Sequence, residues 1–321
     1  MKPFLAVALV LFATDAAAQS YPSRPITIIA PTTAGGPPDT IARLLSEPMR
    51  AVLGQPVIVE NVTGAGSTLG LARVVRAAPD GYTLSIGHLN SHVFSSLTYP
   101  VNYDVVNDFE PISLITIAPM ALFGRSGLPG ENLKELVAWL KDNPDKASFG
   151  SVGLGGPARV WATHFQNTVG TRLQFVPYRG AFAAVQDLIG GQIDLSASEA
   201  SNVAPHVRGG KLKVYAMLSN SRWPVAPEIP TIEETGVPGL QMPFWHGLWA
   251  PKGTPPDVIA KLNEAVTHAL ADPTVRARLQ QMGQEIYPRE QRTPQALALH
   301  QGRGGEVGRG DQGDGRQGGV I

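Results

Sequence analysis

The hydrophobic and polar positions follow two alternating patterns from residue 21 onward. Short, almost fully apolar runs are typical of strands buried on both faces. The segments between them repeat apolar residues every three or four positions, which is typical of amphipathic helices. In the first third of the chain, strands are predicted at 26–31, 56–61 and 82–87 and helices at 39–53 and 67–78. This alternation predicts a parallel sheet covered by helices on both faces.

The same alternation returns in the second half of the chain and predicts a second α/β unit. Its predicted helices and strands lie at 133–144, 147–151, 157–170, 173–178, 181–191, 193–198 and 211–218. The proline-rich stretch 222–245 has no periodicity, which predicts a long surface connection back to the first unit. Two clear helices follow at 255–272 and 273–283.

These patterns predict the fold class α/β, with two doubly wound lobes. The first lobe is expected to be discontinuous, built from 21–118 and 246–300, and the second to comprise 119–241. Two crossovers between such lobes form a hinge, with a cleft between the lobes. We therefore expect the functional site in that cleft.

Both ends of the chain depart from this pattern. Residues 1–18 combine Lys2, a short apolar run and small residues before a cleavage position after Ala18, which is typical of a secretory signal peptide. A buried N-terminal helix is the alternative interpretation. The signal peptide predicts an exported protein, which in a bacterium means the periplasm. Residues 301–321 are dense in glycine and nearly free of apolar side chains, which predicts disorder.

The composition excludes several functional classes. The 26 basic and 26 acidic side chains cancel, so the chain has no basic surplus for binding nucleic acid. The sequence contains no cysteine, which excludes disulfides, zinc–thiolate sites, iron–sulfur clusters and cysteine nucleophiles. No segment after the signal peptide is apolar for long enough to cross a bilayer. We therefore expect no cofactor, no nucleic-acid partner and no direct membrane insertion.

Three strand–helix junctions carry glycines close to the start of a helix. Their residues are Gly35 and Gly36, then Gly64, Gly66, Ser67 and Gly70, and then Ser151, Gly153, Gly155 and Gly156. Loops at the carboxyl ends of parallel strands bind ligands in open α/β sheets. A helix N-terminus offers free N–H groups, and glycine lets a ligand approach the backbone closely. The three junctions together predict an anion site, and plain turns are the alternative interpretation.

No set of side chains forms a convincing catalytic group, so we expect a binding protein and not an enzyme. His88 and His92 have the spacing of metal ligands on a helix, but no acidic residue lies near them, and we expect no metal. Arg159 lies in the first turn of its predicted helix, where a cation opposes the helix dipole and suits contact with an anion. Arg179 and Glu199 also end strands of the second unit. An exported enzyme with a cofactor on the glycine loops is the alternative.

Several stretches, in order along the mature chain, resemble one known family. They include "YPSRPITIIAPTTAGGPPDTIAR", "VIVENVTGAGSTLG", "FVPYRGAFAAVQDLIGGQIDLSAS" and "HGLWAPKGTPPDVIAKLNEAV". These stretches are similar to Bug-type proteins, the substrate-binding subunits of tripartite tricarboxylate transporters. The resemblance implies a type II periplasmic-binding-protein fold, with a two-crossover hinge and one small organic acid or amino acid in the cleft. It also implies a monomer that delivers its ligand to a two-subunit membrane permease, with signalling to a membrane receptor as the alternative.

In this family the first glycine loop holds a carboxylate, mainly through backbone N–H groups and ordered water. The resemblance assigns ligand binding to Ala34, Gly35, Gly36, Asp39, His88, Asn90, Ser91, Ser151, Gly153, Gly156, Ser198 and Glu199. The residues themselves add Gly66, Ser67, Arg159 and Arg179 as candidates.

The sequence departs from the family at several of these positions. His88 is bulkier than the commoner small residues, and Ser198 and Glu199 stand where the family often has an aspartate and then an asparagine. The family also usually ends in a lysine-rich amphipathic helix with a tryptophan. The glycine-dense tail is, as a hypothesis, such a helix read out of frame. The departures at His88, Ser198 and Glu199 concern the identity of the ligand and not the fold.

Overall fold

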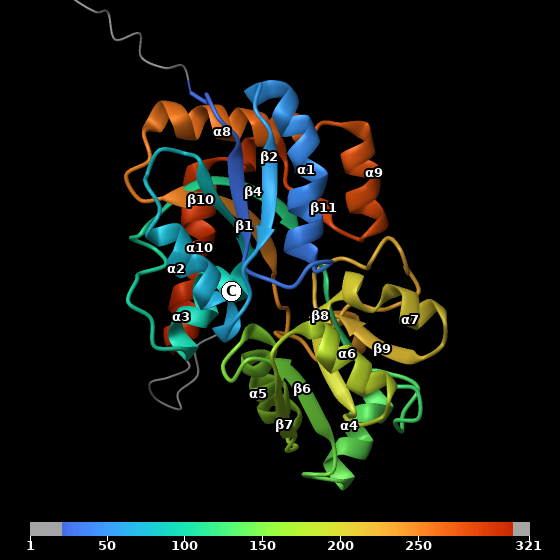
Figure 1. Cartoon of the computed structure of the whole chain (residues 1–321). Coiled ribbons are helices and arrows are strands. Elements are labelled where there is room, and N and C mark those ends of the chain that lie inside the picture. The colour runs from blue at the N-terminus through green and yellow to red at the C-terminus, as the bar shows by residue number, and fades with distance from the viewer. Residues whose placement is uncertain (1–20, 311–321) are drawn as a thin grey trace, which may run out of the picture.

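Two mixed β-sheets organise residues 21–310, the part of the chain that this computed structural model describes (Figure 1). The first sheet has the order β11-β4-β10-β3-β1-β2 and the second the order β7-β6-β8-β5-β9. The strands of the first sheet are β1 (Ile26–Ala30), β2 (Val57–Asn61), β3 (Thr83–His88), β4 (Phe109–Ile117), β10 (Trp245–Pro251) and β11 (Glu285–Ile286). The strands of the second sheet are β5 (Met120–Arg125), β6 (Ser148–Val152), β7 (Gln174–Tyr178), β8 (Leu195–Glu199) and β9 (Leu212–Met217).

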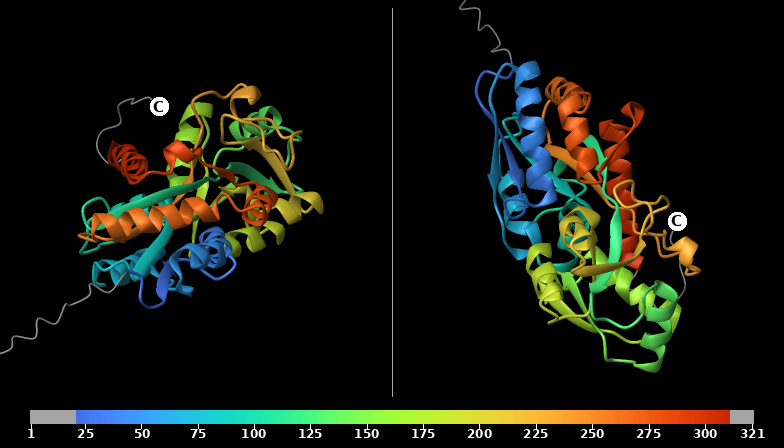
Figure 2. Two further views of the ribbon diagram at one scale, coloured as in Figure 1. Left: turned by 90° about the horizontal axis from the view of Figure 1, so that it is seen from above. Right: turned by 90° about the vertical axis from the view of Figure 1, so that its right-hand side faces the viewer.

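Helices cover both sheets, as the alternation in the sequence predicted. Those around the first sheet are α1 (Pro37–Leu53), α2 (Thr68–Val75), α3 (Ser95–Thr98), α8 (Pro256–Ala269), α9 (Pro273–Gln281) and α10 (Pro294–Gly310). Those around the second sheet are α4 (Leu133–Asp142), α5 (Pro157–Val169), α6 (Ala181–Ile189) and α7 (Ala204–Arg208). The fold is therefore the two-lobe α/β architecture that the sequence predicted, and Figure 2 shows the two parts lying end to end.

Local sequence explains where α1 forms and ends. Ile41, Leu45 and Met49 recur every four positions, and all three are buried against the sheet. Prolines occupy the first two positions of the helix, where a missing N–H is tolerated. The helix ends at Gly54, whose left-handed φ of 71° lets its N–H donate to the Arg50 carbonyl.

The expectation of parallel sheets is only partly correct. β10 runs antiparallel to β3 and β4, and β5 runs antiparallel to β8 and β9. The reason is the two crossovers, because β5 follows β4 and β10 follows β9 from the other sheet. A strand that arrives from the other sheet begins at the boundary between the two sheets and runs away from it. Each strand of a βα unit runs toward that boundary instead.

The proline-rich connection is more deeply buried than predicted. Trp223, Ile232, Leu240 and Met242 are all buried there. The carbonyl of Leu240 also accepts a hydrogen bond of 2.7 Å from the indole N–H of Trp161. The absence of periodicity indicated a loop correctly, but it did not reveal that this loop completes the core.

The prediction of disorder from residue 301 is wrong for its first ten residues, because α10 continues to Gly310. Tertiary contacts account for the difference. Gln301 is buried, its amide N–H donates to the Val105 carbonyl, and its Oε1 accepts a hydrogen bond of 3.2 Å from Trp249. The predicted signal peptide at 1–18 and the rest of the tail, 311–321, lie outside the described residues. No helix within residues 21–310 has both the length and the apolar character of a membrane span.

Candidate ligand-binding site

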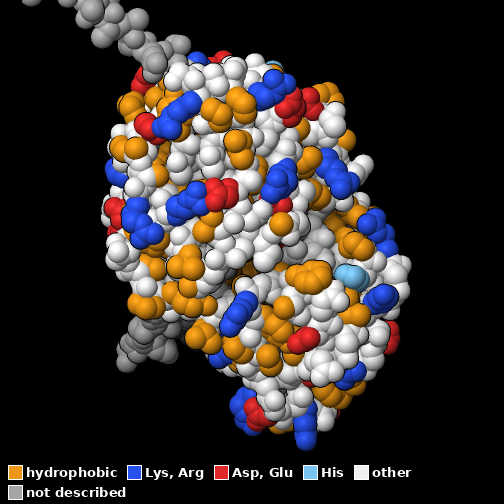
Figure 3. Space-filling view, viewed as in Figure 1, with side chains coloured by type: hydrophobic (Ala, Val, Ile, Leu, Met, Phe, Trp, Pro, Cys, Tyr) orange, Lys and Arg blue, Asp and Glu red, His pale blue; other side chains and the backbone are white. Residues whose placement is uncertain are grey.

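The direction of the strands places the candidate loops at facing edges of the two sheets. β1, β2 and β3 are parallel to one another, and β6, β7 and β8 are parallel to one another. β4 and β9 share these directions and lead directly into the two crossovers. The carboxyl ends of all these strands therefore meet at the junction between the sheets, where open α/β sheets bind ligands. Figure 3 shows that charged side chains of both signs are scattered over one face of the molecule.

The first glycine loop connects β1 to α1 and is open. Ala34 and Gly35 are exposed, and Gly35 has a left-handed φ of 81° with no atom near the position of a Cβ. The N–H of Gly36 donates to the Thr33 carbonyl at 3.1 Å, which closes a tight turn before the helix. The loop therefore presents backbone to the junction without side chains in the way.

Asp39 holds this loop in place. Its Oδ2 accepts a hydrogen bond of 2.8 Å from the Gly35 N–H, and its Oδ1 accepts from Arg43 and Asn61, each at 2.9 Å. Burial opposes ionisation of Asp39, but these hydrogen bonds outweigh it and lower the pKa of the carboxyl. The resemblance assigned Asp39 to ligand binding, and the structure shows that its carboxylate is already occupied by the loop and by two side chains.

We expect Asp39→Asn to remove an acid-sensitive part of the stability. Because the pKa of Asp39 is lower in the folded than in the unfolded protein, its ionised form stabilises the fold. This stabilisation is complete above the unfolded pKa of about 4 and is lost as the pH falls through the lower, folded pKa. Denaturant midpoints of the wild type and Asp39→Asn at pH 7 and pH 3 test this. The wild type should lose more stability on acidification than the variant. Equal losses would show that Asp39 is not the responsible group.

The second glycine loop connects β2 to α2 and has a strained backbone. Gly66 and Ser67 have positive φ values of 63° and 87°, and the ring of Tyr99 covers Gly66 so closely that a Cβ would lie 2.4 Å from it. The hydroxyl of Ser95 also donates to the Gly66 carbonyl. Loops one and two are neighbours, because the Asn61 amide donates to the Thr32 carbonyl at 3.2 Å.

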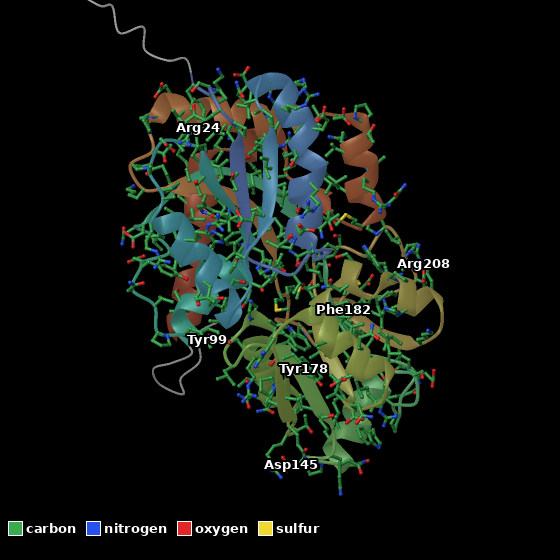
Figure 4. All side chains as sticks on the ribbon, in the orientation of Figure 1. Arg24, Tyr99, Asp145, Tyr178, Phe182 and Arg208 are labelled. Atoms are coloured by element: carbon green, nitrogen blue, oxygen red, sulfur yellow. The ribbon has the colours of Figure 1, made fainter. Side chains whose placement is uncertain are left out.

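The third glycine loop connects β6 to α5 and reaches the first sheet. A Cβ on Gly156 would lie 2.4 Å from the Val152 carbonyl and 3.1 Å from Oδ1 of Asn90. A Cβ on Gly153 would lie 3.7 Å from the hydroxyl of Tyr99. Tyr99 thus lies between the second and third loops, directly after α3 (Figure 4). Its part in joining the two loops was missed in the sequence, where no local pattern distinguishes it.

The residues after β3 have different surroundings from one another. Asn90 faces the third loop, whereas Ser91 is buried and exchanges hydrogen bonds with His88 of the same turn. His92 is also buried, and its ring stacks on Trp249 with 3.6 Å between ring centroids. His88 is half-buried. Within residues 21–310, no group of three or more metal-binding side chains gathers.

The two candidate arginines are not paired with acidic groups in the described part of the chain. The guanidinium of Arg159 lies 3.3 Å from the ring centroid of Phe175, and burial lowers the pKa of Arg159. Arg179 is exposed at the end of β7. Ser151 and Ser198 are buried at the ends of β6 and β8. Arg159 is therefore a stacked cation and Arg179 a surface cation.

Glu199 lies in a buried polar cluster that spans both sheets. Its Oε2 accepts a hydrogen bond of 3.0 Å from the Gln284 amide, and its Oε1 lies 3.5 Å from Nε2 of His246. Thr116 connects Gln284 and His246 with contacts of 2.9 and 3.1 Å. The sequence singled out Glu199 and His88 but not the other three residues, because these are brought together from β4, β10 and the turn before β11.

A cavity of about 680 Å³ lies beside both crossovers. Residues of the first and second crossovers line it, together with Glu285 and His300. None of the glycine-loop residues contributes to its wall. It is thus a different place from the junction where the three loops meet.

Comparisons with known proteins agree with this architecture. The family described as "Tripartite tricarboxylate transporter family receptor", TctC, matches residues 41–306. A UPF0065 protein from the TAR-I ttuE-ttuC' intergenic region of Agrobacterium vitis is 40% identical over 281 residues, which are 88% of this chain and 81% of the relative. MatC from Rhodopseudomonas palustris with bound malate is 37% identical with a TM-score of 0.82, covering 90% of this chain and 100% of MatC. The periplasmic binding protein BugD is 37% identical with a TM-score of 0.83, covering 91% of this chain and 98% of BugD. The chain therefore belongs to the TctC family of periplasmic solute-binding proteins, as its sequence motifs predicted.

Proposed function

We propose that this protein captures a small organic carboxylate between its two lobes and delivers it to a two-subunit membrane permease. The main support for the proposal is that glycine loops from the two sheets approach each other. Gly156 of the third loop lies beside Asn90, and Tyr99 lies between the second and third loops. α1 and α5 begin in these loops, so their positive dipole ends lie at the junction. The malate bound to the related MatC supports the same class of ligand.

Export and hinge motion complete the proposal. We propose that residues 1–18 are a signal peptide removed in the periplasm, and that the chain acts as a monomer. The lobes 21–118 with 246–300 and 119–241 would then move about the crossovers after β4 and β9. A ligand that contacts both lobes shifts such an equilibrium toward the closed arrangement.

A thermal-shift screen tests the carboxylate. Small mono- and dicarboxylates, including malate, should raise the melting temperature, whereas their amides or methyl esters should not, because backbone N–H donors and helix dipoles favour anions. Gly36→Val should abolish the shift, since its Cβ would lie 3.0 Å from Thr32 Oγ1 and 3.2 Å from the Thr33 carbonyl in the first loop.

Gly190→Val is the matched control for Gly36→Val. Gly190 has a φ of −74°, close to the −69° of Gly36, and lies at the end of α6. It should keep the ligand-induced shift. Equal stabilisation by acid and amide, or a normal shift in folded Gly36→Val, would contradict the proposed carboxylate site.

A further inference from the structure

Glu199 and His246 form a contact between the two sheets. Glu199 is the last residue of β8 in the second sheet, and His246 is the second residue of β10 in the first. Their side chains are 5% and 0% exposed, and 3.5 Å separates Glu199 Oε1 from His246 Nε2. Within residues 21–310, Nε2 has no other polar partner, and no lysine or arginine pairs with Glu199. A buried carboxylate needs a compensating positive charge, so the protonation of His246 decides whether Glu199 has one.

The hydrogen bonds determine where the protons of this cluster lie. Gln284 must present its NH₂ group to the carboxylate of Glu199, so its Oε1 is the acceptor that faces Thr116. The Thr116 hydroxyl has one proton and donates it to Gln284. Thr116 Oγ1 is then the acceptor for His246 Nδ1, which must carry a proton.

These hydrogen bonds leave only the protonation of His246 Nε2, the atom beside Glu199, to be determined. With Nδ1 protonated, a neutral His246 would direct the lone pair of Nε2 at the carboxylate, which is repulsive. Protonation of Nε2 would instead place an imidazolium beside an ionised Glu199. Burial opposes ionisation of Glu199, but His246 and Gln284 outweigh it and lower the pKa of the carboxyl.

His88 is the other titratable group that faces this pair. Its ring centroid lies 5.8 Å from that of His246, and its half-buried side chain stands at the end of β3. Burial and the neighbouring His246 lower the pKa of His88 to about 4, although Glu199 acts in the opposite direction. His88 is therefore neutral at neutral pH and supplies no positive charge to Glu199.

We propose that His246 is an internal counter-ion for Glu199, and that the resulting neutral pair makes this protein select carboxylates that lack an ammonium group. The inference rests on the proposed function and specifies its ligand class. A bare Glu199 at the junction would repel a carboxylate and attract the ammonium group of an amino acid. In the structure one carboxylate oxygen accepts a hydrogen bond from Gln284, and the other lies 3.5 Å from His246 Nε2. The pair therefore adds no net charge at the junction, where the part of the ligand that is not held by the glycine loops would lie.

The first experiment compares acids that differ only in one substituent. Isothermal titration of the wild type uses three pairs of acids: glycolate and glycine, lactate and alanine, and malate and aspartate. In each pair the second acid has an ammonium group in place of the hydroxyl of the first. At least one hydroxy acid should bind at least about tenfold more tightly than its amino counterpart. Equal or tighter binding of the amino acids would overturn the inference while leaving the carboxylate function intact. Binding of no carboxylate in these pairs or in the thermal-shift screen would instead contradict the proposed function.

The second experiment tests the counter-ion with a double-mutant cycle. His246→Gln should weaken hydroxy-acid binding by about tenfold or more, because it leaves Glu199 without a positive neighbour. Glu199→Gln should instead tighten it, because it leaves the positive charge of His246 unpaired, and Glu199→Gln/His246→Gln should restore affinity to within about threefold of the wild type. Arg73→Gln, which removes the cation of the half-exposed pair with Glu60, is the matched control and should change nothing.

A ligand-free measurement keeps the inference testable if a variant folds poorly. His246→Gln should gain stability relative to the wild type as pH falls from 7 to 4.5, because an unpaired buried Glu199 takes up a proton on acidification. The same substitution in the Glu199→Gln background should show no such pH dependence. Parallel pH profiles of the wild type and His246→Gln would show that His246 does not neutralise Glu199, and the inference would fail.

Discussion

Gly156→Ala is expected to weaken carboxylate binding by roughly 5- to 150-fold. The added methyl group would lie 2.4 Å from the Val152 carbonyl at the end of β6 and 3.1 Å from Asn90 Oδ1, which follows β3 of the other sheet. Overpacking of this kind costs about 1–3 kcal/mol, which corresponds to that range in affinity. Because the Val152 carbonyl is backbone, the third loop itself must shift, and its N–H groups move away from the ligand. Isothermal titration with the best carboxylate of the thermal-shift screen measures the effect.

Gly209→Ala is the matched control for this substitution. Gly209 also lies in the second lobe, has a φ of −85°, and would place its Cβ 3.4 Å from the nearest atom. It should bind like the wild type. Asn90→Ala tests the same contact from the other side without added bulk, and weaker binding there would support a role for the junction. Affinity within about threefold of wild type in folded Gly156→Ala would show that the third loop does not hold the ligand.

Trp249→Ala is expected to lower the free energy of unfolding by about 3–5 kcal/mol. Trp249 is completely buried on β10 and stacks on His92 at an interplanar angle of 11°. Its indole N–H also donates to Gln301, so the substitution leaves a cavity and removes a buried hydrogen bond. Urea unfolding followed by circular dichroism measures the loss.

Trp139→Ala separates this effect from the loss of any tryptophan. Trp139 is half-buried on α4, so truncating it should cost less than half as much. Similar losses for the two substitutions would mean that the stack of Trp249 on His92 is not a major part of the core. The Trp249→Ala loss should also be larger than that of His92→Ala, since the histidine is the smaller ring.

Local periodicity was sufficient to predict the individual elements and the fold class. The apolar run of β1 and the four-residue spacing of Ile41, Leu45 and Met49 in α1 are properties of neighbouring residues, so they can be read without a structure. The glycines at the three loops were visible for the same reason. Motif order then indicated the family, and the comparisons confirmed it. The candidate site could therefore be located at the carboxyl ends of the strands.

Contacts between distant segments determined the structural features that local sequence patterns did not reveal. The reversed direction of β5 and β10 follows from two crossovers, and the helical start of the glycine-dense tail follows from the burial of Gln301. Tyr99 joins two loops, and His246 meets Glu199 across 47 positions of sequence, with no local pattern to mark either residue. Strand direction, burial and the pairing of charges depend on which segments fold together. Periodicity describes only the residues beside one another, so these features emerged only in three dimensions.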